Sequence, residues 1–213
     1  IFGGNGCGKS TLLNIISGKE GDFKGSVFFN EFDISTVPNY KRAEYIFFIH
    51  QKRGEGLPET FTLLEAYSLL KSNKSHFVNK SKYREDLIEK LSKFNIGLED
   101  VIERQIKSLS GGEYQVFNMF LLDERVANIE NCIVLLDEHT SHLDPIITKK
   151  VVSITKNIIN RDNVISIIIS HSIEEGLNLT KKVMVLKRGS LKAINTFNKD
   201  SVNITNIILD SIK

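Results

Sequence analysis

The sequence has few cysteines, no long apolar run and almost no excess of either charge. Only Cys7 and Cys132 occur among its 213 residues, and two thiols so far apart suggest no disulfide framework, so a reducing compartment is the simpler interpretation. The longest apolar runs, at 45–49 and 164–169, are as long as strands, whereas a membrane-spanning helix needs about 20 apolar residues. We therefore expect that the chain does not cross a bilayer itself.

The charge balance favours no charged partner. Lys and Arg number 28 and Asp and Glu number 26, a formal net charge of +2, so bulk charge argues for neither a nucleic-acid binder nor a polyanion-like tail. With 41% hydrophobic residues the chain can bury one sizeable core, or one core with a small appended subdomain. It begins at Ile1 rather than Met, almost on top of a motif, so we expect its true N-terminus to lie upstream.

Short runs of β-forming residues alternate with helical patterns. Helices are predicted at 10–17 and 145–160, and strands at 26–30, 45–50, 132–136, 164–170 and 182–187. The runs after residue 130 are continuously hydrophobic, which is typical of parallel strands covered on both faces. Strands that alternate with helices predict an α/β sheet.

The segment 51–127 differs because it contains no good strand. Apolar residues recur there at helical spacing, and we interpret these stripes as core packing: Leu63, Leu64, Tyr67, Leu70, Leu87, Ile88, Leu91 and Phe94. The segment therefore looks like a helical subdomain inserted into the α/β core.

The stretch "GGNGCGKST" fits the pattern G-x-x-x-x-G-K-[ST]. In such a loop backbone N–H groups close around phosphate oxygens, and the following helix offers its positive N-terminal end. Lys9 would reach the β- and γ-phosphates, and the Ser10 hydroxyl would ligate Mg²⁺. The alternative is a glycine-rich turn that only starts a helix, but the strand–loop–helix context favours a nucleotide site. Its predicted ATP-binding residues are Gly3, Gly4, Asn5, Gly6, Cys7, Gly8, Lys9, Ser10 and Thr11.

A second motif, "LLDEHTSHLD", places two adjacent carboxylates after the buried run 132–136. In nucleotide sites of this kind an Asp at a strand end holds Mg²⁺, a role that fits Asp137. Glu138 would then face the attacking water as a general base or water-orienting group. The alternative is a pair of solvated carboxylates at a strand end, which the glycine-rich loop in the same chain makes less attractive.

Four further motifs accompany these two in a familiar order. "LSGGEYQ" spans 109–115, "YIFFIHQ" ends at Gln51, "SHLD" spans 141–144, and "IIISHS" contains His171. Together they resemble the signature motif, Q-loop, D-loop and switch histidine of ATP-binding cassette (ABC) ATPases. The resemblance covers essentially the whole chain.

The resemblance implies an α/β fold: a P-loop NTPase (RecA-like) core with an inserted α-helical subdomain and a small antiparallel β element. The chain 1–213 would be a single N-terminally truncated cassette. Residues 1–50 and 128–213 would form the nucleotide-binding core, and residues 51–127 the helical subdomain with the Q-loop and the signature motif.

The resemblance also implies roles for the matched residues. Ser110, Gly111 and Gly112 would open a helix toward the γ-phosphate of ATP held by a second copy, so two copies would enclose two ATP molecules. Gln51 would contact Mg²⁺ and the water, His171 would hydrogen-bond the γ-phosphate as a catalytic residue beside Glu138, and Asp144 would act across the interface. The implied metal ligands are Ser10, Gln51 and Asp137.

Two departures from the family pattern stand near these motifs. His139 replaces the usual proline after the catalytic glutamate, and Cys7 stands where serine is common in such loops. His139 and His142 raise the alternative of a metal pair, but histidines in loops beside carboxylates are more often simple polar contacts. For Cys7 we favour a packed, inert thiol over a redox switch.

"DEHTSHLDP" and "HQKRGEGLPETFTLLEA" together resemble one subgroup of bacterial importers, whose extracellular binding lipoprotein takes tryptophan, tyrosine or related small solutes. The implied partners are a transmembrane permease, a second copy of the ATPase and such a lipoprotein, with no nucleic acid. The implied location is peripheral, on the cytoplasmic face of the plasma membrane. In this setting exposed apolar residues between Leu57 and Leu70 would be a docking patch for the permease rather than core.

Three other kinds of cassette fit the sequence less well. Chromosome-associated members carry a long coiled coil between loop and signature, but here only about a hundred residues separate Lys9 from Ser110, without sustained heptads. Translation-factor members carry two cassettes in one chain, and only one is seen. A non-hydrolysing cassette would be expected to lack Glu138 or His171, and both are present.

Overall fold

The computed structural model describes residues 1–50, 54, 56–72 and 80–196. Gln51, the predicted Q-loop residue, lies outside the described residues. The chain divides into two compact units, one made of 1–48, 130–139 and 162 onward, the other of 49–129 and 140–161. The functional division at 51–127 stays a prediction.

Strands and helices alternate from residue 132 to residue 187, as the sequence predicts. The helices are α1 Lys9–Ser17, α2 Asn39–Arg42, α3 Leu63–Lys71, α4 Lys80–Ser92, α5 Gly111–Val126, α6 Pro145–Ile159 and α7 Ile173–Leu179. The strands are β1 Phe28–Phe29, β2 Phe32–Asp33, β3 Ile46–Ile49, β4 Cys132–Asp137, β5 Val164–Ile169, β6 Lys182–Lys187 and β7 Ser190–Thr196.

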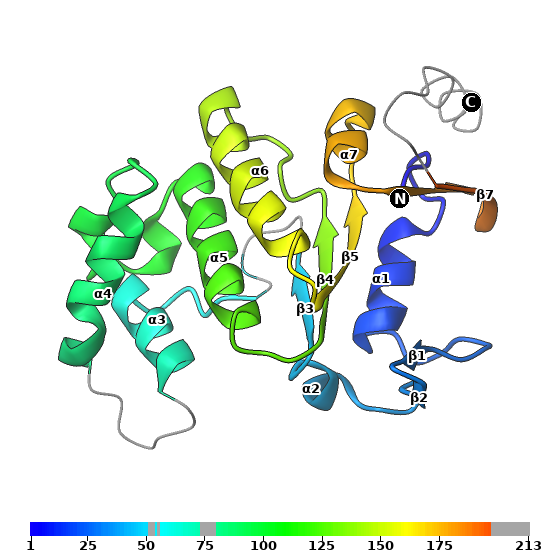
Figure 1. The fold of residues 1–213 in the computed structure, drawn as a ribbon, viewed down its shortest axis with the longest axis horizontal. Coiled ribbons are helices and arrows are strands. Elements are labelled where there is room, and N and C mark those ends of the chain that lie inside the picture. Colours follow the sequence, from blue (N-terminus) through cyan, green and yellow to red (C-terminus); the bar gives the residue numbers. More distant parts are fainter. Residues whose placement is uncertain (51–53, 55, 73–79, 197–213) are drawn as a thin grey trace. The chain divides into compact units, whose positions relative to one another are not determined.

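The centre of the first unit is a sheet in the order β3-β4-β5, and β4 and β5 run parallel with Asp137 opposite Ile169 (Figure 1). Every residue of β4 is buried, in keeping with its continuous hydrophobic sequence. The first two residues of the chain lie between β5 and β6. Ile1 N donates to Ile168 O at 2.5 Å, and Phe2 N donates to Met184 O at 2.9 Å.

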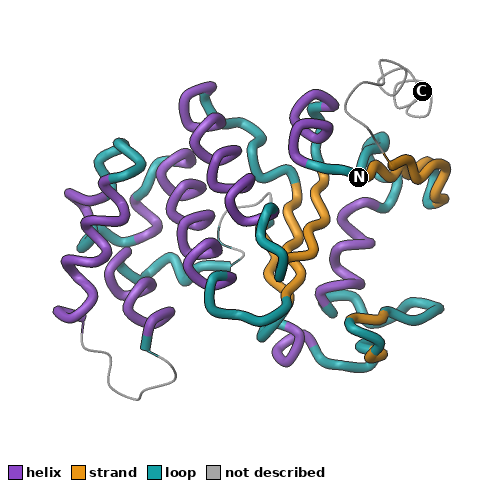
Figure 2. The backbone as a smooth tube through the Cα atoms, viewed as in Figure 1, coloured by secondary structure: helices purple, strands orange, loops and turns teal. Residues whose placement is uncertain are grey.

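Two antiparallel hairpins complete this unit, β1 with β2 and β6 with β7. The small antiparallel element of the predicted fold is therefore present. The helix α1 lies beside the sheet (Figure 2). It packs against the sheet because Leu13 shares one core cluster with Ile46 of β3, Leu135 of β4 and Ile169 of β5. This packing fixes the helix that follows the glycine-rich loop.

The second unit is helical. Its helix α3 begins with a capping box, in which Thr62 Oγ1 accepts from Glu65 N at 3.1 Å and Glu65 Oε2 accepts from Thr62 N at 2.8 Å. Leu63, Leu64 and Tyr67 are at most 2% exposed, so the predicted core packing of these three residues is confirmed. Because they are buried, they cannot belong to the docking patch that we expect between Leu57 and Leu70.

The second stripe is only partly core. Leu87 and Leu91 of α4 are fully buried, whereas Ile88 is 36% exposed. The prediction for Ile88 is wrong because its neighbour in sequence, Leu87, takes the inward-facing position of the helix.

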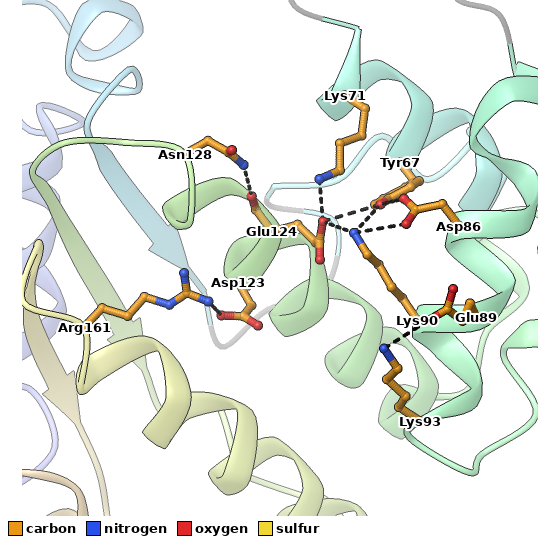
Figure 3. A network of polar contacts seen from close by, with 10 residues as sticks. All are labelled: Tyr67, Lys71, Asp86, Glu89, Lys90, Lys93, Asp123, Glu124, Asn128 and Arg161. Atoms are coloured by element: carbon orange, nitrogen blue, oxygen red, sulfur yellow. Dashed lines mark hydrogen bonds and ion pairs between the residues drawn. The ribbon is translucent and has the colours of Figure 1, made fainter.

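A polar network connects three helices of the second unit (Figure 3). Glu124 of α5 accepts from Lys90 of α4 at 2.8 Å and pairs with Lys71 of α3 at 2.5 Å. Tyr67, fully buried, accepts from Lys90 Nζ at 2.9 Å and donates to Asp86. These contacts join α3, α4 and α5 through charged groups as well as apolar packing.

Among the described residues, no helix combines the length and the apolar character needed to cross a bilayer.

Candidate functional site

The glycine-rich loop runs between Phe2 and α1 in the first unit and is held against the β6–β7 turn. Cys7 O accepts from Gly189 N at 3.1 Å, and Leu186 N donates to Phe2 O at 2.9 Å. A Cβ at Gly3 would lie 2.3 Å from Leu186 O and 2.6 Å from Cys7 Sγ, so no side chain fits there. Cys7 is buried, as expected of a packed thiol.

Lys9 closes the loop on itself. Its side chain is buried, and Nζ donates to Gly3 O at 2.9 Å and Gly4 O at 3.1 Å. The next two residues, Ser10 and Thr11, are exposed in the first turn of α1, which contains no acidic residue. A loop of backbone N–H groups, a lysine and a positive helix end together form an anion-binding arrangement.

The two carboxylates follow β4 and have different surroundings. Asp137 is the last residue of the strand and is 7% exposed. Glu138 has φ +49°, a left-handed conformation that costs a residue with a side chain about 1–3 kcal/mol. Its N–H donates to Ile169 O at 3.0 Å, so the strained residue is held by the neighbouring strand.

Glu138 and His171 meet at the ends of two neighbouring strands. His171 Nε2 lies 2.5 Å from Glu138 Oε1, with side-chain exposures of 53% for the histidine and 10% for the glutamate. The two residues follow β4 and β5, which pair in parallel and therefore end at the same edge. The sequence predicted both residues but not their contact, although the two strand ends were the signal for it.

The histidines of the "DEHTSHLD" loop are not alike. His139 is 3% exposed, and burial lowers its pKa to about 4, which keeps the ring neutral near pH 7. His142 has φ +63°. Within the described residues no group of three or more His, Cys, Asp and Glu side chains is placed to hold a metal ion.

Ser110 and Asp144 belong to the second unit, and each caps a helix. Ser110 Oγ accepts from Glu113 N at 3.2 Å at the start of α5, and Glu113 Oε2 accepts from Ser110 N at 2.7 Å. Asp144 Oδ1 accepts from Ile146 N at 2.9 Å and Ile147 N at 3.0 Å at the start of α6.

The signature residues leave the start of α5 open to a ligand. Ser110 and Gly111 are exposed, and a Cβ at Gly111 would meet nothing within 4 Å. The Ser110 hydroxyl accepts a hydrogen bond and keeps its own proton for another acceptor. A Cβ at Gly112 would lie only 3.2 Å from Ile147 Cγ1 of α6, so this glycine serves helix packing.

Mg²⁺ fits the donors that the first unit supplies. The Ser10 hydroxyl is exposed at the start of α1, and the Asp137 carboxylate ends β4. Both are hard oxygen ligands of the kind Mg²⁺ takes, and this ion commonly keeps several water and phosphate ligands besides one or two from the protein. Ser10 and Asp137 would therefore hold the ion together with nucleotide phosphates.

Known proteins resemble this chain in sequence. A family model described as ABC transporter matches residues 1–141. The tyrosine transport ATP-binding protein of Clostridioides difficile is similar, with 29% identity over 212 residues that cover 96% of this chain and 81% of that protein. An ABC transporter ATP-binding protein of Methanocaldococcus jannaschii is 32% identical, over 91% of this chain and 72% of that protein.

A solved structure confirms the predicted fold class. It is a dimeric ATP-binding cassette in a post-hydrolysis state bound to ADP and Pi, with a TM-score of 0.73 and 23% identity. The match covers 91% of this chain and 82% of that one. The core of the chain therefore has the P-loop NTPase fold.

Proposed function

The chain belongs to the ABC transporter family of ATP-binding cassette ATPases, and from this premise we propose that it is the ATP-hydrolysing subunit of an importer with a separate permease. The observation that carries the proposal is the contact between Glu138 and His171, in the same unit as the glycine-rich loop. A nucleotide-binding loop alone would support binding, whereas this pair adds a base and its partner.

Phosphate binding is the task of the loop and α1. When the β- and γ-phosphates enter, their oxygens replace the Gly3 and Gly4 carbonyls as acceptors for Lys9 Nζ. Because a charged phosphate oxygen is a stronger acceptor than a carbonyl oxygen, Lys9 Nζ forms stronger hydrogen bonds to the phosphates than to the loop carbonyls. The N-terminal end of α1 adds the field of its backbone dipoles.

Hydrolysis is the task of Glu138 and His171. Glu138 accepts the proton of the attacking water, and its strained backbone, held by Ile169 O, fixes the carboxylate in place. His171, half exposed, contacts Glu138 and can direct an N–H toward the γ-phosphate as charge develops. Mg²⁺ held by Ser10 and Asp137, with Gln51 as the third predicted contact, would neutralise charge on the phosphates.

A second copy would complete the site. The exposed start of α5, with the free proton of Ser110 and the open approach at Gly111, suits a γ-phosphate presented by the partner. Asp144 would act at the same interface, with its position fixed by its capping bonds to α6. Two ATP molecules would then lie between two copies.

Import of a small solute is supported by the relatives. Similar proteins are named for tyrosine transport, for spermidine/putrescine import and for tungstate uptake. The sequences "DEHTSHLDP" and "HQKRGEGLPETFTLLEA" favour an amino acid such as tyrosine or tryptophan. Such an importer would add a permease and an extracellular binding lipoprotein, and would place this chain on the cytoplasmic face of the plasma membrane.

The permease would contact α3 at its exposed residue. Leu69 is 55% exposed, whereas the apolar residues on the opposite face of α3 are buried in the core. We expect Leu69→Glu to abolish permease-stimulated ATPase activity and transport while basal activity and folding persist. Normal transport by this variant would place the docking site elsewhere.

Dimerisation and uptake together test the proposal. Glu138→Gln protein should be a dimer with ATP and a monomer with ADP in light scattering, and adding Ser110→Arg should abolish the dimer. Monomers under all conditions contradict the shared site. Cells that express the chain with its permease and binding lipoprotein should take up radiolabelled tyrosine, and Glu138→Gln should stop this uptake. Uptake of another solute instead of tyrosine would still support import but would contradict an amino acid as the substrate.

A further inference from the structure

Arg42 is a buried cation in the first unit that the site described above does not use. It is 1% exposed at the end of α2. Its guanidinium donates to backbone carbonyls of the described chain: Nε to Val37 O at 2.8 Å, Nη1 to Ile15 O and Ile16 O at 2.8 Å each, and Nη2 to Ser35 O at 2.9 Å. A charged side chain is almost never buried this fully unless its polar groups are paired, as these are.

Two of these carbonyls belong to the last turn of α1. The final carbonyls of a helix have no partner within the helix and carry its negative dipole end. Asn14 O accepts from Lys19 N at 2.9 Å, Ile15 O accepts from both Gly18 N at 3.1 Å and Arg42, and Ile16 O accepts from Arg42. Arg42 therefore caps the C-terminal end of the helix whose N-terminal end carries Lys9 and Ser10.

The other two bonds attach this helix end to the segment before α2. Val37 O and Ser35 O belong to residues 34–38, and Tyr45 N donates to Arg42 O at 3.0 Å directly before β3. One arginine thus joins the end of α1, the segment 34–38 and the start of β3.

Gly18 shows that the space around the guanidinium is filled. It has φ +79° and follows α1 directly. A Cβ there would lie 3.0 Å from Arg42 Cδ and Nε. The left-handed turn that ends α1 and the side chain that caps it therefore fit together closely.

We propose that Arg42 is a positioning residue for ATP, which holds α1 at its far end so that Lys9 and Ser10 keep their places at the phosphates. The proposal rests on the nucleotide site proposed above. A helix of nine residues is about 13.5 Å long at about 1.5 Å per residue. A tilt of about 5° about its anchored end would displace the other end by about 1 Å, and a misplacement of that size can cost about 10²-fold in rate.

The test compares Arg42→Met, which keeps the length of the side chain but donates nothing, with Arg42→Lys, which keeps one cationic donor. The dissociation constant of ATP, kcat and KM are measured at a temperature where circular dichroism shows each variant folded. For Arg42→Met we expect ATP affinity or kcat/KM to fall about tenfold. The values of Arg42→Lys should lie between those of Arg42→Met and the original protein. Unchanged binding and turnover in folded Arg42→Met would overturn the proposal.

Leu91→Ala is the matched control for lost stability. Leu91 is fully buried in α4 of the second unit, so its truncation destabilises the protein without touching α1. When each variant is measured the same number of degrees below its own melting temperature, Leu91→Ala should bind ATP as the original protein does. If Leu91→Ala loses as much ATP affinity as Arg42→Met, the effect of Arg42 is on stability alone and the positioning role is wrong. Where Arg42→Met yields no folded protein, Arg42→Lys decides alone, because original affinity and turnover in that variant overturn the proposal.

Lys9→Ala separates this proposal from the proposed function. If Lys9→Ala leaves ATP binding intact, the nucleotide site itself is wrong. If Lys9→Ala weakens binding and Arg42→Met does not, only the role of Arg42 is wrong.

Discussion

Replacing Glu124 by Gln should destabilise the second unit far more than a similar change at the surface. Glu124 is 17% exposed and pairs with Lys71 at 2.5 Å and Lys90 at 2.8 Å (Figure 3). The substitution keeps the shape of the side chain and removes its charge. Two ammonium groups, 24% and 27% exposed, would then lose their shared carboxylate.

The magnitude follows from these contacts. A hydrogen bond to a charged group contributes about 1.5–3 kcal/mol to the free energy of unfolding. Because both lysines are partly exposed, we expect the two contacts of Glu124 to contribute about 2–3 kcal/mol together. For a chain of this size each kcal/mol shifts the melting temperature by about 2–4 °C, so we expect a loss of about 4–12 °C in thermal denaturation at pH 7.

Glu89→Gln is the matched control. Glu89 pairs with Lys93 at 3.5 Å on the surface of α4, with exposures of 76% and 66%. Such a pair contributes at most about 0.5 kcal/mol, so the melting temperature should move by about 2 °C or less. Equal shifts for Glu124→Gln and Glu89→Gln would refute the assignment of stability to the partly buried network around Glu124.

The pH dependence of the Glu124 effect has a defined sign. Burial alone would raise the pKa of Glu124, but hydrogen bonds from Lys71 and Lys90 hold that pKa below its ordinary value of 4.5. A carboxyl with a lowered pKa stabilises the folded state above its ordinary pKa, and this contribution is lost as the pH falls through the folded value. The difference between Glu124→Gln and the original protein should therefore be full at pH 7 and shrink below pH 4.5. A difference that persists unchanged in acid would contradict this explanation.

Three further outcomes are expected. Gly3→Ala should reduce ATP affinity at least tenfold in calorimetry, because its Cβ would lie 2.3 Å from Leu186 O, and unchanged affinity would contradict the described loop geometry. Cys7→Ser should keep ATP affinity within about threefold, since we assign the thiol to packing, and a larger loss would indicate a specific role. Arg161→Met should cost about 1–2 kcal/mol in urea denaturation, because it leaves Asp123, 2.5 Å away and 28% exposed, without this cation, and a neutral result would make the pair unimportant.

Local patterns predicted the elements that carry the chemistry. The helix predicted at 10–17 is observed at Lys9–Ser17, and the strand predicted at 132–136 extends by one residue to Asp137. These segments are predictable because glycines, a Lys-Ser pair and an apolar run with terminal carboxylates each leave a strong mark on the sequence.

Features that depend on distant parts of the chain were not predictable in the same way. The burial of Arg42 leaves no pattern, because its partners are backbone carbonyls from residues 15 to 37. The division of the 87–94 stripe into core and surface depends on which neighbours cover it, so the buried Leu87 and the exposed Ile88, both placed in that stripe, could not be told apart from spacing. The strand β7 pairs with β6, but polar and apolar residues do not alternate in its sequence strongly enough to predict a strand.

ATP turnover by Glu138→Gln is the most direct test of the proposed hydrolytic site. The amide keeps the size of the carboxylate that contacts His171 but cannot accept a proton from water. Loss of a general base lowers kcat by about 10²–10⁴-fold, equivalent to about 3–5 kcal/mol of barrier. We expect this fall with ATP binding retained, while Lys9→Ala weakens binding itself. Near-full turnover by Glu138→Gln would contradict the role of Glu138 as the base.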